Sequence, residues 1–336
     1  MADVILHSTQ HFTDADLTAI ASYLKSLPPG KDDLPMPSVA IAPVTAPDTL
    51  FTTRGGLGYT QFCADCHRPD GGGVKGMFPP LNGNPGILAS NPATLLHITL
   101  TGWKTAETAA HPRVWTMPGF ARLADDEIAE ILSFVRSSWG NDAPAIKPAQ
   151  VAHMRKQLNP DTHGPRAFVT PRLANLLTAS NADQVVRGMR LHLQTKALLP
   201  DNVGNALNCT SCHLNAGTVA DGSPFVGVSA FFPGYAPRAG KQITLQERIN
   251  GCFRRSMDGK PLAVTSPDMQ AMVAYFDWMK MNTAPGDKVA GRGVGKVDPG
   301  IKPDMGNGKA VYVKQCAVCH GDNGQGLKHA DGGFIF

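Results

Sequence analysis

Six of the seven cysteines in this chain occur in three copies of the sequence Cys-x-x-Cys-His. Cysteines three residues apart lie on one face of a helical turn, so both thiols can form thioethers with the vinyl groups of one haem, and the histidine that follows can bind its iron. Zinc sites and thioredoxin-type redox pairs also use Cys-x-x-Cys, but neither requires histidine directly after every pair. The spacing therefore predicts three covalent haem c sites. They comprise Cys63, Cys66 and His67; Cys209, Cys212 and His213; and Cys316, Cys319 and His320.

The seventh cysteine, Cys252, has no partner among the other six. A leftover cysteine indicates either a reactive thiol or a bond to another molecule. Thr244 and Glu247 have the spacing of a capping box, which predicts a helix that carries Cys252. Arg248 and Ser256 then share one helix face with Cys252, because residues four apart are neighbours on a helix.

The surroundings of Cys252 are basic. Between Arg238 and Lys260 there are six basic side chains and two acidic ones. Nearby cations favour the thiolate form of a cysteine, so this cluster is typical of a reactive thiol. The alternative is an ordinary solvated helix face around a buried, inert cysteine. The net charge of the whole chain is +4 without a block of like charges, which gives no support to nucleic-acid binding and leaves small anions as partners.

The elements that must position these residues are predicted to be helices joined by long loops. With 35 Gly, 27 Pro and 17% charged residues among 336, the composition suits small helical domains better than one long-helix bundle or a disordered chain. No stretch approaches 18 apolar residues, so no transmembrane segment is predicted. Residues 1–30 lack the features of a signal peptide, although haem attachment of this kind normally follows export. We therefore expect a periplasmic protein from a bacterium.

Two helices are marked by their caps and apolar stripes. Thr13, with Asp16 three residues later, predicts a helix over 13–27, and Asp125 is the predicted N-cap of a second helix. The stripes consist of Leu17, Ile20, Leu24 and Leu27 in the first helix and of Ile128, Ile131, Leu132, Val135 and Trp139 in the second. Each stripe marks an amphipathic helix.

The haem motifs and spacers divide the chain into segments. The sequence around the first motif, GYTQFCADCHRPDGGG, aligns with that around the last, VYVKQCAVCHGDNGQG. The same haem-domain sequence pattern therefore occurs twice in the chain. Prolines between the first helix and residue 48 favour an extended spacer. The predicted segments are a C-terminal remnant of a haem domain at 1–30, a Pro-rich linker at 31–48, a complete haem domain at 49–142, a connector at 143–182, a catalytic haem domain at 183–283, a linker at 284–303 and a truncated haem domain at 304–336.

Residues 1–142 resemble the cytochrome c subunits of membrane-bound alcohol dehydrogenases, and MADVILHSTQHFTDADLTAIASYLKSLPP is similar to the end of one of their haem domains. The resemblance implies a mainly α fold of tandem class I cytochrome c-like domains with long loops. It implies that Met1 is a distal iron ligand, so we expect the chain to be a fragment. In RVWTMPGF, Met117 occupies the Met-Pro loop that carries the sulfur ligand in this family. The alternatives are a methionine that fills a core gap and, as weaker competitors for the iron, His97 and His111.

A second resemblance covers about residues 171–336. The segment LNCTSCHLNAGTVADGSPFVGVSAFFPGYAPRAGKQITLQERINGCFRRSMDGKPL, followed by SPDMQAMVAYFDWM, resembles the dihaem thiosulfate dehydrogenases, which are related to the sulfur-oxidation cytochrome SoxA. GKAVYVKQCAVCHGDNGQG looks like the start of their second haem domain. The resemblance implies that Cys252 is the distal ligand of the haem at the middle motif, that Arg238 and Arg248 hold the anionic substrate, and that Ser256 lies close by.

This second resemblance implies oxidative coupling of two thiosulfate ions to tetrathionate. A thiolate ligand lowers the potential of a haem and a methionine ligand raises it, so electrons are expected to pass from the Cys252 haem toward Met-ligated haems. The downstream acceptor would be a cytochrome, a terminal oxidase or a quinone-linked complex. Two alternatives stay open: an electron-transfer subunit of a membrane-bound dehydrogenase without catalysis of its own, and a SoxA-like sulfur transferase. His192, upstream on a helix, is interpreted as structural.

Overall fold

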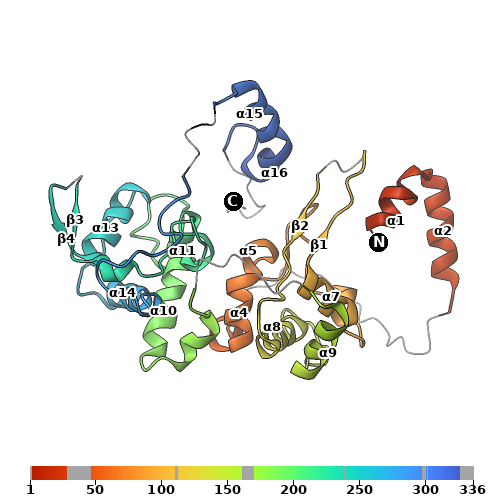
Figure 1. The fold of residues 1–336 in the computed structure, drawn as a ribbon, viewed down its shortest axis with the longest axis horizontal. Helices are drawn as coiled ribbons and strands as arrows, with labels where there is room; N and C mark the ends of the chain where they lie inside the picture. The colour runs from red at the N-terminus through yellow and green to blue at the C-terminus, as the bar shows by residue number, and fades with distance from the viewer. Residues whose placement is uncertain are drawn as a thin grey trace. The chain divides into compact units, whose positions relative to one another are not determined.

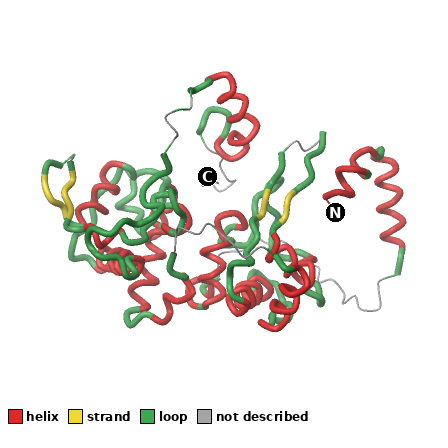
Figure 2. The backbone as a smooth tube through the Cα atoms, in the orientation of Figure 1, coloured by secondary structure: helices red, strands yellow, loops and turns green. Residues whose placement is uncertain are grey.

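The computed structural model describes residues 2–28, 47–109, 113–160, 170–237, 239–296, 300 and 302–325. Helices and loops dominate this part of the chain, with two small two-stranded antiparallel sheets (Figure 1; Figure 2). The predicted mainly α class with long loops is confirmed. Within these ranges, no helix has both the length and the apolar character needed to cross a membrane.

Contacts between residues group the chain into two compact units, of which unit 1 comprises residues 1–50 and 63–164 and unit 2 comprises residues 51–62 and 165–336. Unit 1, with α3 at its boundary, contains α1 (Ala2–His7), η1 (Thr9–His11), α2 (Asp14–Ser26), α3 (Thr49–Thr52), α5 (Ala64–His67), α6 (Pro85–Leu88), α7 (Ala93–Thr101), β1 (Trp103–Lys104), β2 (Thr116–Met117), α8 (Asp125–Ser137) and α9 (Pro148–Leu158). Unit 2 contains α4 (Arg54–Phe62), η2 (Leu173–Thr178), α10 (Ala182–Leu193), α11 (Thr195–Leu198), η3 (Cys209–Ser211), α12 (Leu214–Gly217), η4 (Val228–Phe231), β3 (Gly234–Ala236), β4 (Lys241–Ile243), α13 (Leu245–Arg255), α14 (Pro267–Met279), α15 (Met305–Val311), η5 (Tyr312–Cys316) and α16 (Ala317–His320).

Helix α2 begins at the predicted cap. The Thr13 hydroxyl accepts a hydrogen bond from the Asp16 N–H at 3.2 Å, and the Asp16 carboxylate accepts one from the Thr13 N–H at 3.2 Å. The helix ends at Ser26, before the two prolines. The capping prediction is confirmed, and in the described part of the chain the apolar stripe of α2 is exposed, Leu24 by 59%.

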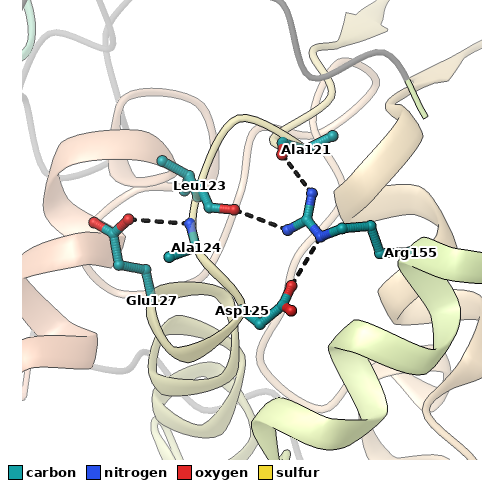
Figure 3. A network of polar contacts seen from close by, with 6 residues as sticks. All are labelled: Ala121, Leu123, Ala124, Asp125, Glu127 and Arg155. Atoms are coloured by element: carbon teal, nitrogen blue, oxygen red, sulfur yellow. Dashed lines mark hydrogen bonds and ion pairs between the residues drawn. The ribbon is translucent and has the colours of Figure 1, made fainter. Parts of the chain in front are cut away.

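Helix α8 supplies much of the core of unit 1. Ile128, Ile131, Leu132 and Val135 of its predicted stripe are buried, with Ile128 only 1% exposed. The prediction is wrong for Trp139, which is buried but lies after the end of the helix with a φ of +57°. The predicted cap is wrong by one residue, because Ala124 is the N-cap and its N–H donates to the Glu127 carboxylate at 3.2 Å (Figure 3). Asp125 is instead the first helical residue, because Glu127 has the N3 position relative to Ala124, and the Asp125 carboxylate accepts a hydrogen bond from α9.

Arg155 of α9 makes that contact (Figure 3). Its Nε donates to the Asp125 carboxylate at 2.8 Å, and its two terminal nitrogens donate to the carbonyls of Ala121 and Leu123, the latter at 2.8 Å. A planar guanidinium can satisfy several acceptors in fixed directions. Arg155 therefore holds the start of α8 and the loop that leads from the Met117 strand in one arrangement.

We expect Arg155→Ala to lower the free energy of unfolding of the haem-loaded protein by roughly 2–3 kcal/mol, because hydrogen bonds from a charged donor contribute about 1.5–3 kcal/mol. Denaturant unfolding followed by circular dichroism measures the loss. Lys156→Ala is the matched control, since Lys156 is exposed on the same helix. Equal losses in the two variants would contradict the role of Arg155.

In unit 2, α10 packs against α14 at Gly188. A Cβ atom at this position would lie 2.0 Å from the Ala271 carbonyl oxygen, so only glycine allows this close approach. Tyr275 of α14 is fully buried, and its hydroxyl donates to the Ala216 carbonyl at 2.8 Å. These contacts connect α10 and α14 to α12, directly after the middle haem motif.

Helix α4 ends directly before Cys63, yet its contacts place it in unit 2. Gln61 is 1% exposed, and its side chain accepts from the Leu173 N–H at 2.9 Å and donates to the Pro171 carbonyl at 3.2 Å. The Asn215 side chain donates to the Gln61 carbonyl. Through Asn215, α4 is bound to the segment that follows the middle haem motif.

Candidate functional site

The first motif lies at the start of the second segment of unit 1, residues 63–164. Cys63 precedes α5, which carries Cys66 and ends at His67. The Nδ1 of His67 bonds to the Pro79 carbonyl at 3.0 Å. Burial lowers the pKa of His67 and the bond to Pro79 raises it. An Nδ1–H held by a carbonyl orients an imidazole and leaves Nε2 for a metal, which is the arrangement of an iron-binding histidine.

Met117 lies in β2, opposite Trp103 of β1. Two glycines bring this loop against the end of α7, because a Cβ at Gly102 would lie 2.5 Å from the Met117 carbonyl oxygen and one at Gly119 would lie 2.8 Å from the Leu100 carbonyl oxygen. His97 is exposed on α7, and His111 lies outside the described residues, as does Met1. The loop that carries Met117 is thus built from close backbone packing, and iron ligation by Met117 stays a prediction.

Met117→Leu tests that ligation with a side chain of similar volume. We expect the potential of the haem at Cys63 to fall by on the order of 0.1 V or more, because a thioether ligand raises haem potential. The near-infrared charge-transfer band of Met-ligated ferric haem should disappear. Met77→Leu is the control, since Met77 lies in the same unit outside the Met-Pro loop. A wild-type redox titration of Met117→Leu would exclude Met117 as the ligand.

The middle motif opens onto a cavity of unit 2 with about 530 Å³ of space, its open side included. The residues of the wall that carry chemistry are Cys209, Cys212, His213, Cys252, Ser256 and His192. The apolar part of the wall includes Phe225, Ile249, Phe253, Met257, Met272 and Phe276. Unit 2 thus brings the haem motif, the unpaired cysteine and Ser256 together, as the resemblance implied.

Two hydrogen bonds orient the middle motif. The Nδ1 of His213 bonds to the Ser223 carbonyl at 2.6 Å, and the Cys209 N–H donates to the Thr195 hydroxyl oxygen at 3.0 Å. Burial lowers the pKa of His213, the Ser223 carbonyl raises it and the Arg248 guanidinium lowers it. Burial also raises the pKa of Cys209 to about 12. A neutral imidazole suits iron binding.

Cys252 lies on α13, whose capping box is confirmed. The Thr244 hydroxyl accepts from the Glu247 N–H at 3.1 Å, and the Thr244 N–H donates to the Glu247 carboxylate at 2.8 Å. Arg248 lies one turn before Cys252 on the helix. Its guanidinium donates a hydrogen bond to the Cys252 sulfur at 3.1 Å. Arg248 and Ser256 are exposed, and Arg238 lies outside the described residues. The contact places the positive charge of the Arg248 guanidinium beside the Cys252 sulfur, in the wall of the cavity that contains the haem motif.

His192 belongs to this cavity, which the sequence interpretation as a structural residue did not anticipate. It is 1% exposed; its Nδ1 bonds to the Gly188 carbonyl at 2.7 Å, and in the described part of the chain its Nε2 has no hydrogen-bond partner. Burial lowers the pKa of His192 to about 4, so the ring is neutral at pH 7. The sequence did contain a sign of this position, because His192 lies on the same apolar helix face as Val185 and Met189. A polar residue on a buried face needs a hydrogen-bond partner or a ligand.

The third motif follows α15 and begins at Cys316, the last residue of the π-helix η5. The Tyr312 hydroxyl donates to the Gly321 carbonyl at 2.6 Å, which closes the turn around the motif. His320 ends α16, and the side chain of Cys319 lies outside the described part. A haem at this motif stays a prediction.

The residues at the first two motifs fit haem c. Each motif combines two thiols with an imidazole whose Nδ1 is held by a backbone carbonyl. The middle motif faces a largely apolar cavity, and the His192 Nε2 in its wall has no hydrogen-bond partner among the residues that the structure describes. Within the described ranges, no three His, Cys, Asp or Glu side chains cluster in a way that could hold a metal ion.

Comparisons with known proteins agree with this arrangement. Residues 53–139 match the cytochrome c family and residues 201–279 match the SoxA/TsdA cytochrome c domain family. The chain is 43% identical over 152 residues to a thiosulfate dehydrogenase of Psychrobacter arcticus. These 152 residues are 45% of this chain and 46% of that protein. It is 41% identical over 159 residues to the cytochrome c subunit of a quinone-type alcohol dehydrogenase of Gluconacetobacter polyoxogenes. This match covers 46% of this chain and 34% of that protein. The chain thus spans less than half the length of either relative.

A solved structure has a similar fold. The thiosulfate dehydrogenase TsdBA of Marichromatium purpuratum, in its as-isolated form, matches with a TM-score of 0.55 and 24% identity, over 97% of this chain and 65% of that one. Cytochrome c domains of these families carry covalently bound haem c. Both resemblances predicted from the sequence are therefore confirmed, and the chain contains a cytochrome c domain followed by a SoxA/TsdA cytochrome c domain.

Proposed function

We propose that this chain oxidises thiosulfate, joining two ions into tetrathionate and passing the electrons through its haems. The observation that supports this most directly is the position of Cys252. Its sulfur lies on the wall of the cavity that also contains Cys209, Cys212 and His213, and it accepts a hydrogen bond from Arg248. A plain electron carrier has no need for a guanidinium-bound thiol in its haem pocket.

The reaction forms one sulfur–sulfur bond between the terminal sulfurs of two thiosulfate dianions and removes two electrons, so four negative charges become two. Repulsion between the dianions is the main barrier to bringing them together. Guanidinium groups bind sulfonate oxygens in a fixed planar geometry and offset this repulsion. Arg248 is placed for that role beside Cys252, and Arg238 is the second arginine that the resemblance implies. The Ser256 side chain lines the same cavity and can accept or donate one further hydrogen bond.

Cys209 and Cys212 would hold the haem by thioethers, and His213 and Cys252 are the residues of this cavity that would bind its iron. Bound haem c supplies one-electron oxidation. The Cys252 thiolate can bond to the terminal sulfur of one thiosulfate with the loss of two electrons, which would pass to the electron acceptor through the bound haem. The terminal sulfur of the second thiosulfate would then attack that substrate sulfur, which forms tetrathionate and releases the Cys252 thiolate beside Arg248. Electrons would leave through the Met117 haem to a cytochrome, a terminal oxidase or a quinone-linked complex. This chemistry fits the periplasm, where haem c is attached.

The direct test mixes the haem-loaded chain with thiosulfate and ferricyanide. We expect two thiosulfate ions to be consumed and two ferricyanide ions to be reduced for each tetrathionate formed. Mass spectrometry of the peptide that contains Cys252 is run in parallel. An extra sulfur on Cys252 without tetrathionate would indicate a sulfur transferase instead.

A second function has one observation in its favour, the 41% identity to the cytochrome c subunit of an alcohol dehydrogenase. In that case the chain would only carry electrons. Haems that thiosulfate cannot reduce, but that a quinone-type dehydrogenase with its own substrate reduces, would replace the first proposal with this one.

A further inference from the structure

The segment 289–295, here called the strap, lies along the loop that follows the middle haem motif. The Asp221 N–H donates to the Gly291 carbonyl at 2.7 Å, and the Gly295 N–H donates to the Asp221 carbonyl at 3.1 Å. Val294 forms a β-bridge with Gly222. The strap therefore pairs with the loop through backbone hydrogen bonds, although about 70 residues separate them in the sequence.

The strap is anchored at a second place. The Arg292 guanidinium lies over the ring of Phe231, 3.5 Å from its centre. A Cβ at Gly227, whose φ is +73°, would lie 2.8 Å from a methyl carbon of Val289, so the backbone there packs directly on the strap. Side-chain and backbone contacts on both sides of the loop thus fix the strap in place.

The strap also holds the residue that orients His213. The Ser223 N–H donates to the Gly293 carbonyl at 2.8 Å, and the Ser223 carbonyl accepts from the His213 Nδ1 at 2.6 Å. Ser223 has a φ of +53°, a left-handed conformation that serine rarely adopts without external support. The hydrogen bond from Gly293 supplies that support, so strap, Ser223 and His213 form one chain of contacts.

We propose that the strap is a positioning element for the His213 imidazole and thereby sets the reduction potential of the haem at the middle motif. The inference rests on the part of the proposed function that makes His213 an iron ligand. A carbonyl that accepts the Nδ1–H makes the imidazole a stronger donor, which stabilises ferric iron and lowers the potential. Loosening the strap weakens this bond, so the potential should rise.

Two glycines of the same linker give a matched test. Gly293 has a φ of +90° and Gly286 a φ of +91°, and a Cβ at either position would meet nothing within 4 Å. Alanine therefore introduces the same backbone strain at both sites without a clash. Only Gly293 holds Ser223, whereas the backbone around Gly286 bonds within the linker, with the Asp287 N–H on the Ala284 carbonyl.

Redox titrations of the haem-loaded Gly293→Ala and Gly286→Ala proteins, followed by electron paramagnetic resonance, measure the effect without thiosulfate. The signal of the middle haem is assigned by its loss in a Cys209→Ala/Cys212→Ala protein. We expect an upward shift of its potential in Gly293→Ala and none in Gly286→Ala. Arg292→Ala, which removes the Phe231 contact, should shift the potential of the middle haem in the same direction. If Gly293→Ala does not fold, the potential of Arg292→Ala alone tests the role of the strap.

Equal potentials in the parent, Gly293→Ala and Arg292→Ala proteins would overturn the role of the strap. A shift that Gly286→Ala shares would also overturn it, because the cause would then be general linker strain. If the Gly293→Ala shift occurs while the parent forms no tetrathionate, the strap stands and only the proposed function fails.

Discussion

Replacing Cys252 with alanine is expected to lower thiosulfate-dependent tetrathionate formation at least roughly 100-fold, while the haems remain covalently attached. The sulfur of Cys252 is the group in the cavity that combines proximity to the haem motif with a guanidinium contact at 3.1 Å. Alanine adds no helix penalty on α13, so the change removes the sulfur alone. Tetrathionate is quantified at saturating thiosulfate, and haem content is measured per chain.

The same variant has a spectroscopic consequence. A thiolate bound to low-spin ferric haem gives a distinct electron paramagnetic resonance signal, and we expect Cys252→Ala to lose it. Arg254→Ala is the control, because Arg254 is exposed on the same helix. Full turnover of Cys252→Ala, or a thiolate signal that survives the change, would remove Cys252 from the mechanism.

Arg248→Ala is expected to lower kcat/KM for thiosulfate by roughly 10- to 100-fold, because a hydrogen bond between charged groups contributes about 1.5–3 kcal/mol and 1.4 kcal/mol is tenfold. Much of the loss should be in KM, since the arginine binds the substrate anion before reaction. Arg248→Lys keeps the charge but loses the planar fork, so its loss should be intermediate. Steady-state kinetics at two ionic strengths separate charge from geometry, because salt screens the charge contribution.

Arg255 provides the matched control for Arg248. It lies on the same helix and is exposed, but its Nε donates to the Gly251 carbonyl at 3.2 Å, so it is bound to its own backbone. We expect Arg255→Ala to retain most of the activity. If both arginine variants lose activity equally, the effect comes from the general positive charge of α13 and not from the contact with Cys252.

The sequence by itself determined the features that depend on residues close together in the chain. These features include the three Cys-x-x-Cys-His motifs, whose two cysteines are three residues apart. They also include the capping boxes at Thr13 and Thr244, which depend on hydrogen bonds between residues three apart, and the buried stripe of α8, which follows from helix periodicity. The contact between Arg248 and Cys252 belongs to this group, because residues four apart on a helix meet whatever surrounds them.

Only the tertiary structure decided the features that depend on the path of the loops. The Asp125 carboxylate, predicted to cap α8, instead accepts a hydrogen bond from Arg155, thirty residues later in the sequence. His192 faces the haem cavity because Gly188 lets α10 approach α14. The carbonyl that orients His213 is held by Gly293, which no local pattern links to it. Such contacts are set by packing between distant segments, and the periodicity of a single helix carries no information about which segments will meet.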